Sequence, residues 1–165
     1  MKLNQIFNPT TLIVFISLAL LGFSLFQTAI TYNDYNGIGK SQGLDLFLMG
    51  SIAILGGGLL EWIIWLANPI SLWSIILFFQ KKDKAKLISK IALGIALSFV
   101  FWQNILTSGN GRQAIILHKN SGYWLWLLSI FILTVGIHRY LTPAPESTSK
   151  LIDKRHEIKP NGESI

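Results

Sequence analysis

The chain reads LFLMGSIAILGGGLLEWIIWL from Leu46 to Leu66, an apolar run with a single charged residue, Glu61. A helix of about 20 residues spans the roughly 30 Å hydrocarbon core of a bilayer, so this run is long enough to cross a membrane. Pro69 follows shortly after, and a proline interrupts the hydrogen-bond ladder of a helix. We therefore predict a membrane span over residues 44–66 that ends before Pro69.

Three further apolar runs have a comparable length. They predict spans over residues 11–30, 87–106 and 123–141. Residues 70–79 are apolar but would reach only about 15 Å as a helix, so we expect an interfacial or re-entrant helix there. The sequence thus predicts an all-α integral membrane four-helix bundle within residues 1–141. The polar segment 142–165 is predicted to be a disordered cytoplasmic tail.

The composition agrees with a membrane class. Hydrophobic residues make up 51% of the chain, the mean hydropathy is +0.48, and charged residues make up only 13%. Soluble domains carry about 25% charged residues. The first apolar run is longer than the core of a typical secretory signal peptide, so we interpret it as a retained anchor rather than a cleaved signal.

Several kinds of chemistry are unsupported by the residues present. The chain contains no cysteine, which excludes a disulfide framework, a thiolate metal site and thiol redox chemistry. The three histidines do not form a metal-binding motif, and no Gly-x-Ser-x-Gly sequence occurs. We therefore expect no catalytic residues, no cofactor and no metal.

The positive charges predict an orientation. With both termini and the loop at residues 80–86 on one side, all but three of the 14 lysines and arginines lie on that side, the exceptions being Lys40, Arg112 and Lys119. Positive charges near span ends favour the cytoplasmic side. We expect both termini in the cytoplasm and, from the small size and the basic loops, location in a bacterial inner membrane.

The basic loop itself has two interpretations. It determines the orientation, and this role alone would explain its charge. It could also bind anionic lipid, since each basic residue near the surface contributes about 1 kcal/mol. The candidate lipid contacts are Lys81, Lys82, Lys84 and Lys86. Nucleic acid is not an expected partner, because the cluster is short and adjoins the membrane.

Glu61 is the most informative single residue. An ionisable group within an apolar span is costly and is a candidate functional residue. Gly56, Gly57 and Gly58 directly precede it and would allow a neighbouring backbone to pack closely at its depth. The alternative is structural: the carboxylate could reach the inner interface beside Trp62 and Trp65, or it could pair with Lys81, Lys82 or Lys90.

The leading functional hypothesis is a small, non-enzymatic multi-pass protein that associates through its helices with a membrane partner or with further copies of itself. Small residues on one helix face, such as Gly50, Ala53 and Gly57, favour close helix packing. A first alternative is a small oligomeric transporter or an ion- or proton-conducting protein that uses Glu61. A second is an enzyme that acts on lipid or quinone at the inner headgroup level.

Overall fold

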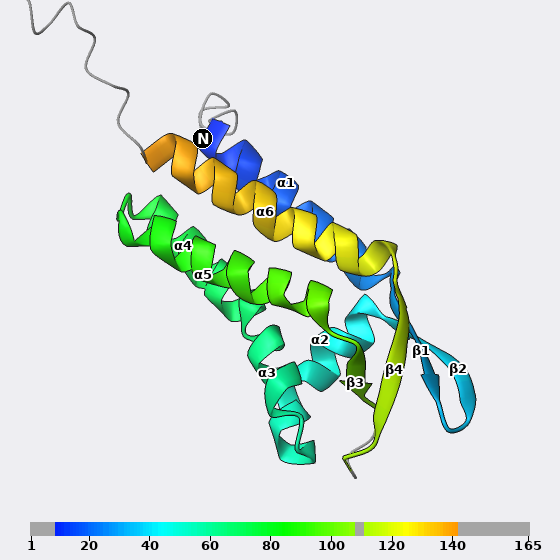
Figure 1. Cartoon of the computed structure of the whole chain (residues 1–165). Helices are drawn as coiled ribbons and strands as arrows, with labels where there is room; N and C mark the ends of the chain where they lie inside the picture. The colour runs from blue at the N-terminus through cyan, green and yellow to red at the C-terminus, as the bar shows by residue number, and fades with distance from the viewer. Residues whose placement is uncertain (1–8, 108–110, 142–165) are drawn as a thin grey trace, which may run out of the picture.

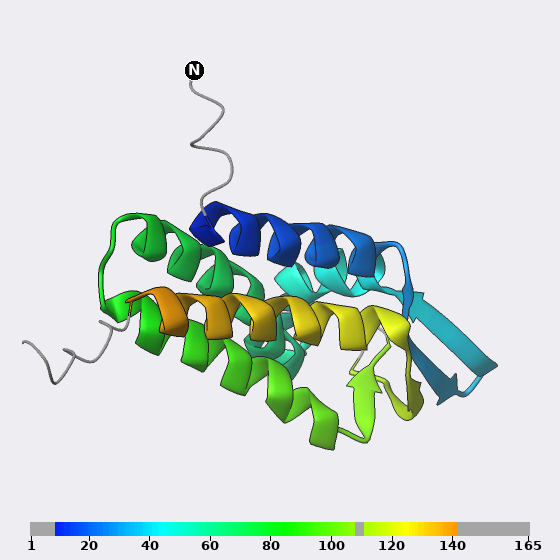
Figure 2. The same cartoon turned by 90° about the horizontal axis from the view of Figure 1, so that it is seen from above.

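Two pairs of helices run lengthwise beside each other, and a sheet closes one end of them (Figure 1). The computed structural model describes residues 9–107 and 111–141. One pair consists of α1 (Pro9–Leu25) and α6 (Ser121–Leu141), and the other of α4 (Ala67–Phe79) and α5 (Lys84–Ser98). Seen from above, α1 and α6 remain side by side along most of their length (Figure 2).

Small residues and buried hydroxyl groups hold the helices together. Gly136 of α6 faces Ile13 of α1, where any side chain at residue 136 would collide with the isoleucine. The buried Ser17 hydroxyl of α1 donates a 2.8 Å hydrogen bond to the Ser129 carbonyl of α6. Such close approaches are typical of helices that pack without large side chains between them.

The sheet has four antiparallel strands in the order β2-β1-β4-β3. The strands are β1 (Thr28–Asp34), β2 (Gly37–Gln42), β3 (Asn104–Leu106) and β4 (Gln113–Lys119). β1 and β2 form a hairpin in which Asp34 pairs with Gly37, and the positive φ of 104° at Gly37 suits a glycine. β4 lies between β1 and β3, with Tyr32 opposite Ile116.

A broken helical segment leads from the sheet to α4. It comprises α2 (Gly43–Ile52), the 3-10 helix η2 (Ala53–Gly56) and α3 (Leu59–Trp65). After α5, a second short 3-10 helix, η3 (Phe99–Phe101), returns the chain to β3. The sheet, α2 and α3 therefore lie together at one end of the long helices (Figure 1).

The predicted all-α four-helix membrane bundle is wrong. The fold is mixed α/β, with 69% of the described residues in helices and a four-stranded antiparallel sheet. In the described part of the chain, two helical stretches are long and apolar enough to cross a membrane: Leu59–Phe79 and Ser121–Leu141. The ends of the first and third apolar runs leave the helix because they pair as strands: β1 pairs with the adjacent β2 and with the distant β4, and β3 pairs with β4, which follows it in the sequence.

The prediction for residues 44–66 also fails, in the middle of the run and at its end. The run is divided at Gly57, whose φ of 84° ends η2 in a left-handed conformation. Pro69 does not end a crossing, because it lies in the first turn of α4, where a missing N–H costs little. Ile70 N–H donates to the Leu66 carbonyl at 3.1 Å, so residues 70–79 continue the helical stretch that begins at Leu59.

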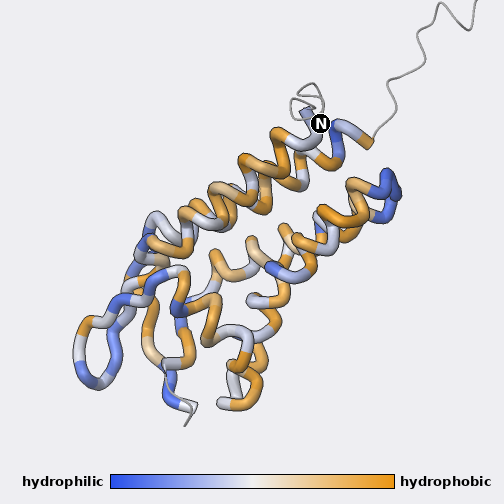
Figure 3. Tube along the Cα trace, turned by 180° about the vertical axis from the view of Figure 1, so that it is seen from behind, coloured by the Kyte–Doolittle hydropathy of each residue, from blue (hydrophilic) through white to orange (hydrophobic). Residues whose placement is uncertain are grey.

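The end opposite the sheet gathers three parts of the chain. The start of α1, the turn between α4 and α5, and the end of α6 all lie there (Figure 1). Hydropathy follows this arrangement, with apolar residues along the helices and hydrophilic residues at the α4–α5 turn and in the β1–β2 hairpin (Figure 3). The predicted tail at 142–165 lies outside the described residues.

Candidate functional site

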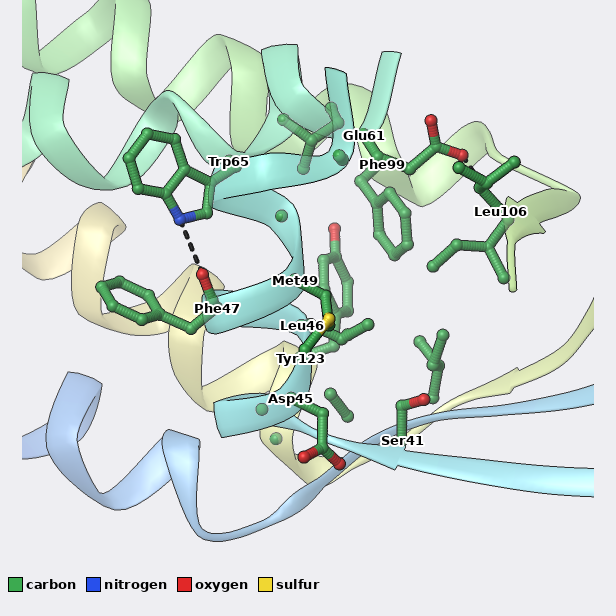
Figure 4. Close-up of a pocket in the computed structure, with 18 of the residues that line it drawn as sticks. Ser41, Asp45, Leu46, Phe47, Met49, Glu61, Trp65, Phe99, Leu106 and Tyr123 are labelled. Atoms are coloured by element: carbon green, nitrogen blue, oxygen red, sulfur yellow. Dashed lines mark hydrogen bonds between the residues drawn. The ribbon is translucent and has the colours of Figure 1, made fainter. Parts of the chain in front are cut away.

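A cavity of about 560 Å³ lies at the sheet end of the molecule, and we call it the chamber (Figure 4). Its walls come from α2, η2 and α3, from the strands, and from the starts of η3 and α6. Most of the side chains that line it are apolar, among them Leu46, Met49, Ile64, Phe99 and Ile105. Cavities of roughly 300–1,000 Å³ with apolar walls are typical of small-molecule sites.

The wall formed by α2 and α3 is fixed by one tryptophan. The Trp65 indole N–H donates to the Phe47 carbonyl at 2.8 Å, and the two rings lie 6.3 Å apart (Figure 4). Gly50 allows this contact, because a Cβ there would lie 2.9 Å from Trp65 Cδ1. The small residue at 50 thus serves packing between α2 and α3.

Asn68 joins this wall to α6. Its buried side chain accepts a hydrogen bond from the Trp126 indole N–H at 2.8 Å and donates one to the Trp65 carbonyl at 2.9 Å. Each polar atom of this amide therefore has a partner, as buried polar groups require. These bonds link the wall of the chamber to α6.

The exposed part of the chamber lining is mainly apolar. Four residues line the chamber and are also exposed: the apolar Met49, Ile52 and Leu55, with exposed fractions of 62%, 53% and 87%, and the charged Asp45. Leu59 and Leu60 continue this exposed apolar surface on α3. Exposing such apolar surface to water is unfavourable, whereas exposing it to lipid is not.

Glu61 lies in the first turn of α3, at the sheet end. Its Oε1 atom accepts a 2.9 Å hydrogen bond from the backbone N–H of Leu106 in the edge strand β3. Figure 4 shows the carboxylate beside Leu106. The side chain lines the chamber and also a second cavity of about 370 Å³, which we call the side pocket. Glu61 therefore forms part of the boundary between two cavities.

The structural alternative for Glu61 named the wrong neighbours. Lys81 and Lys82 follow α4, whose 13 residues separate them from α3 by about 20 Å of helix. The carboxylate instead pairs with a strand backbone that lies 45 residues further along the sequence. The hydropathy of the sequence does not predict this contact, because the contact depends on where β3 lies in the fold.

The three glycines before Glu61 have separate positions. Gly56 lines the chamber and Gly57 lines the side pocket. Gly58 faces both Leu106 and Glu61, since a Cβ there would lie 2.9 Å from Leu106 Cδ2 and 3.0 Å from Glu61 Oε2. Close approach of β3 to the carboxylate therefore depends on the absence of a side chain at Gly58.

The four lysines predicted to contact lipid lie far from the chamber, around the α4–α5 turn. Lys81, Lys82 and Lys84 are exposed, and Lys86 forms a 3.1 Å ion pair with Asp83. Their clustering at one end is compatible with contact to a charged surface. Their predicted role in lipid binding stays a prediction.

Apart from Glu61 and Gly56, the residues that line the chamber were not predicted as a site. Asp45 and Glu61 are the two carboxylates that line it, and Asp45 accepts a bond from the Gln42 N–H at 3.0 Å. Within residues 9–107 and 111–141, no group of three or more potential side-chain ligands is placed to hold a metal ion. Comparisons with protein-family models, curated proteins and solved structures found no match for this chain.

Proposed function

We propose that this protein is anchored in a membrane and binds one long-chain amphiphile, taken from the bilayer, in the chamber. The observation that carries the proposal is a mainly apolar cavity of about 560 Å³, whose exposed lining residues are the apolar Met49, Ile52 and Leu55 together with Asp45. A methylene group gains about 0.8 kcal/mol on burial from water, so a chain that leaves lipid for an apolar cavity loses little. We retain the prediction that the protein acts without catalysis.

The surface of the two candidate spans supports the membrane anchor. Exposed large apolar side chains occur on α4 at Leu72, Trp73, Ile76 and Phe79, and on α6 at Trp124, Leu128, Phe131 and Val135. Contiguous exposed apolar surface of this kind favours contact with lipid or with another protein. Contact with lipid would cover these faces without requiring another protein.

The charges support an orientation for this anchor. The α4–α5 turn carries the lysine cluster, and Arg139 lies near the end of α6 at the same end of the molecule (Figure 1). By the excess of positive charge, this end is proposed to face the cytoplasm of a bacterial inner membrane, with the sheet and the chamber on the opposite side.

The test of the binding function is to fill the chamber. Ala53 lines it, so Ala53→Trp should occupy the space of the ligand, whereas Ser51→Trp places the same side chain on α2 at a residue that does not line the chamber. We expect native mass spectrometry of the full chain, purified in a mild detergent, to detect one bound amphiphile in the wild type and in Ser51→Trp. Ala53→Trp should carry none.

Two results would contradict the binding function. One is equal occupancy in Ala53→Trp and the wild type. The other is a wild-type protein that never carries a long-chain molecule, even after purification from membranes without added detergent in copolymer-bounded lipid particles. Thermal unfolding of the three proteins would show that each variant is folded.

Conduction through Glu61 is a second candidate function, favoured by the contact of this side chain with both cavities. A wild-type protein that increases proton flux into vesicles, and a Glu61→Gln variant that does not, would support it. Helix association with a membrane partner also stays a proposal. Cross-linking in native membranes would test it, and a strictly monomeric result would oppose it.

A further inference from the structure

The two cavities that meet at Glu61 differ in the share of polar residues. The chamber is mainly apolar, whereas the lining of the side pocket between α3 and the edge strand β3 combines three amide residues, Gln103, Asn104 and Gln113, with Leu59, Leu60, Trp102 and Leu106. An amphiphile has the same division, with an apolar chain and a polar head. Glu61 lies at the boundary where the chain would end and the head would begin.

The carboxylate retains an acceptor at this boundary. Oε1 is occupied by the Leu106 N–H at 2.9 Å, while Oε2 has no hydrogen-bond partner among the residues that the structure describes. A carboxylate oxygen accepts strong hydrogen bonds, above all from charged donors. The head that lies beside it should therefore donate.

The charge of the two linings is one-sided. Asp45 and Glu61 contribute carboxylates, and no lysine, arginine or histidine lines either cavity in the described part of the chain. Lys119 approaches from outside the lining, but its ammonium donates to the Trp102 carbonyl at 2.9 Å and lies 5.7 Å from the centre of the Phe99 ring. A carboxylate or phosphate head would meet a like charge at Glu61, with no cation in either lining to offset it.

Resting on the proposed function, we infer that Glu61 binds the head of the amphiphile and that this head is a hydrogen-bond donor without negative charge. An amine head pairs with the carboxylate directly, and a hydroxyl head donates to Oε2 and reaches the amides of the side pocket. The chain of the same molecule lies in the chamber. Fatty acids and phosphate-headed lipids are rejected.

Photo-crosslinking with three dodecyl probes tests this selectivity. Each probe carries a diazirine on the chain, and the heads are an amine, a hydroxyl or a carboxylate. The full chain is labelled in phosphatidylcholine nanodiscs. For each probe, the labelling of chamber peptides is divided by the labelling of the outer face of α6 near Phe131. This division corrects for the different partition of the probes into lipid. We expect the amine probe to label the chamber about tenfold more than the carboxylate probe, as for one charge-assisted hydrogen bond.

Two matched variants locate the head. Glu61→Gln removes the charge but keeps an oxygen that can accept from Leu106 N–H, and it should bring the amine-to-carboxylate ratio close to one. Asp45→Asn removes the other carboxylate of the chamber and should leave the ratio within about twofold of the wild type. Because each ratio is measured on one protein sample, a reduced folded fraction does not alter it.

The outcomes separate the two proposals. Equal chamber labelling by the amine and carboxylate probes, an unchanged ratio in Glu61→Gln, or a lost ratio in Asp45→Asn alone would overturn the inference and leave the binding function standing. If none of the three probes labels the chamber above the level of Ala53→Trp, the binding function is overturned, and the inference with it.

Discussion

At the end of the helices away from the sheet, Leu133 and Ile137 of α6 pack with Val14, Ile75 and other buried side chains into one cluster. At the sheet end, a second cluster around Ile30 and Tyr123 lies beside a cavity of about 560 Å³. Protein interiors are normally close-packed, and voids cost stability. Both ends contain a buried apolar cluster, but the sheet end also contains a large cavity, which agrees with the proposed binding function at that end.

The largest difference between the two ends should appear when the same residue type is truncated in each. Ile137 is fully buried in the cluster at the end away from the sheet, so Ile137→Ala should lower the free energy of unfolding by about 2–4 kcal/mol. Ile52 lines the mouth of the chamber and is 53% exposed, so Ile52→Ala should cost less than about 1 kcal/mol. Denaturant unfolding of the full chain in detergent measures both, and equal losses would erase the proposed contrast.

Glycine substitutions sharpen the comparison at the junction of sheet and helices. A Cβ at Gly122 would lie 2.8 Å from the Gln27 carbonyl oxygen and 3.0 Å from Ala29 Cα, which are backbone atoms that cannot rotate away. Gly122→Ala should therefore destabilise by about 1–3 kcal/mol. Gly22 of α1 has open space around it, so Gly22→Ala should be neutral or stabilise by up to about 1 kcal/mol. A neutral Gly122→Ala in thermal unfolding would show that β1 and α6 can move apart.

The amide that joins the chamber wall to α6 should have a moderate effect. Asn68→Ala removes the acceptor of the Trp126 indole N–H, and leaving a buried donor without a partner costs about 1–3 kcal/mol. Asn104 is exposed on the edge strand, and Asn104→Ala should change stability by less than about 0.5 kcal/mol. If Asn68→Ala and the wild type have the same free energy of unfolding, a water molecule must accept the hydrogen bond of the Trp126 indole N–H in place of the amide.

The smallest effect concerns pH at the sheet end. Burial lowers the pKa of Lys119 below its usual value, because desolvation disfavours the ammonium. The unfolded chain then holds this proton more tightly, so the stability contribution of Lys119 should rise as the pH increases from its folded pKa towards 10.5. The melting temperature of the wild type, relative to that of Lys119→Met, should therefore rise between pH 8 and 10.5. A difference that does not vary with pH would contradict it.

Some of the missed fold had a local signal. Asn36-Gly37 is typical of a tight hairpin turn, and Gly37 does follow the turn between β1 and β2. The short strand β3 offered no comparable signal, because three residues are too few for a period. It is defined by its pairing with β4, in which Ile105 lies opposite Ala114.

The candidate site, too, was only partly predictable from the sequence. Glu61 was noticeable in the sequence because a charge in an apolar run is costly. Its partner, the Leu106 N–H, was not, because any backbone amide could have filled that role. The chamber itself could not be inferred, since a cavity is defined by residues from several elements and no single segment encodes it.

The sequence by itself determined the apolar helices, the end at which the lysines gather, and the presence of one unusual carboxylate. These properties follow from composition and from local periodicity, which each segment carries alone. Only the tertiary structure decided that the ends of two apolar runs become strands, that Glu61 meets the sheet rather than the lysines, and that a chamber forms between them. Those features depend on hydrogen bonds and packing between separate segments, some neighbouring, as β3 and β4, and some far apart, as Glu61 and Leu106, and no single segment contains that information.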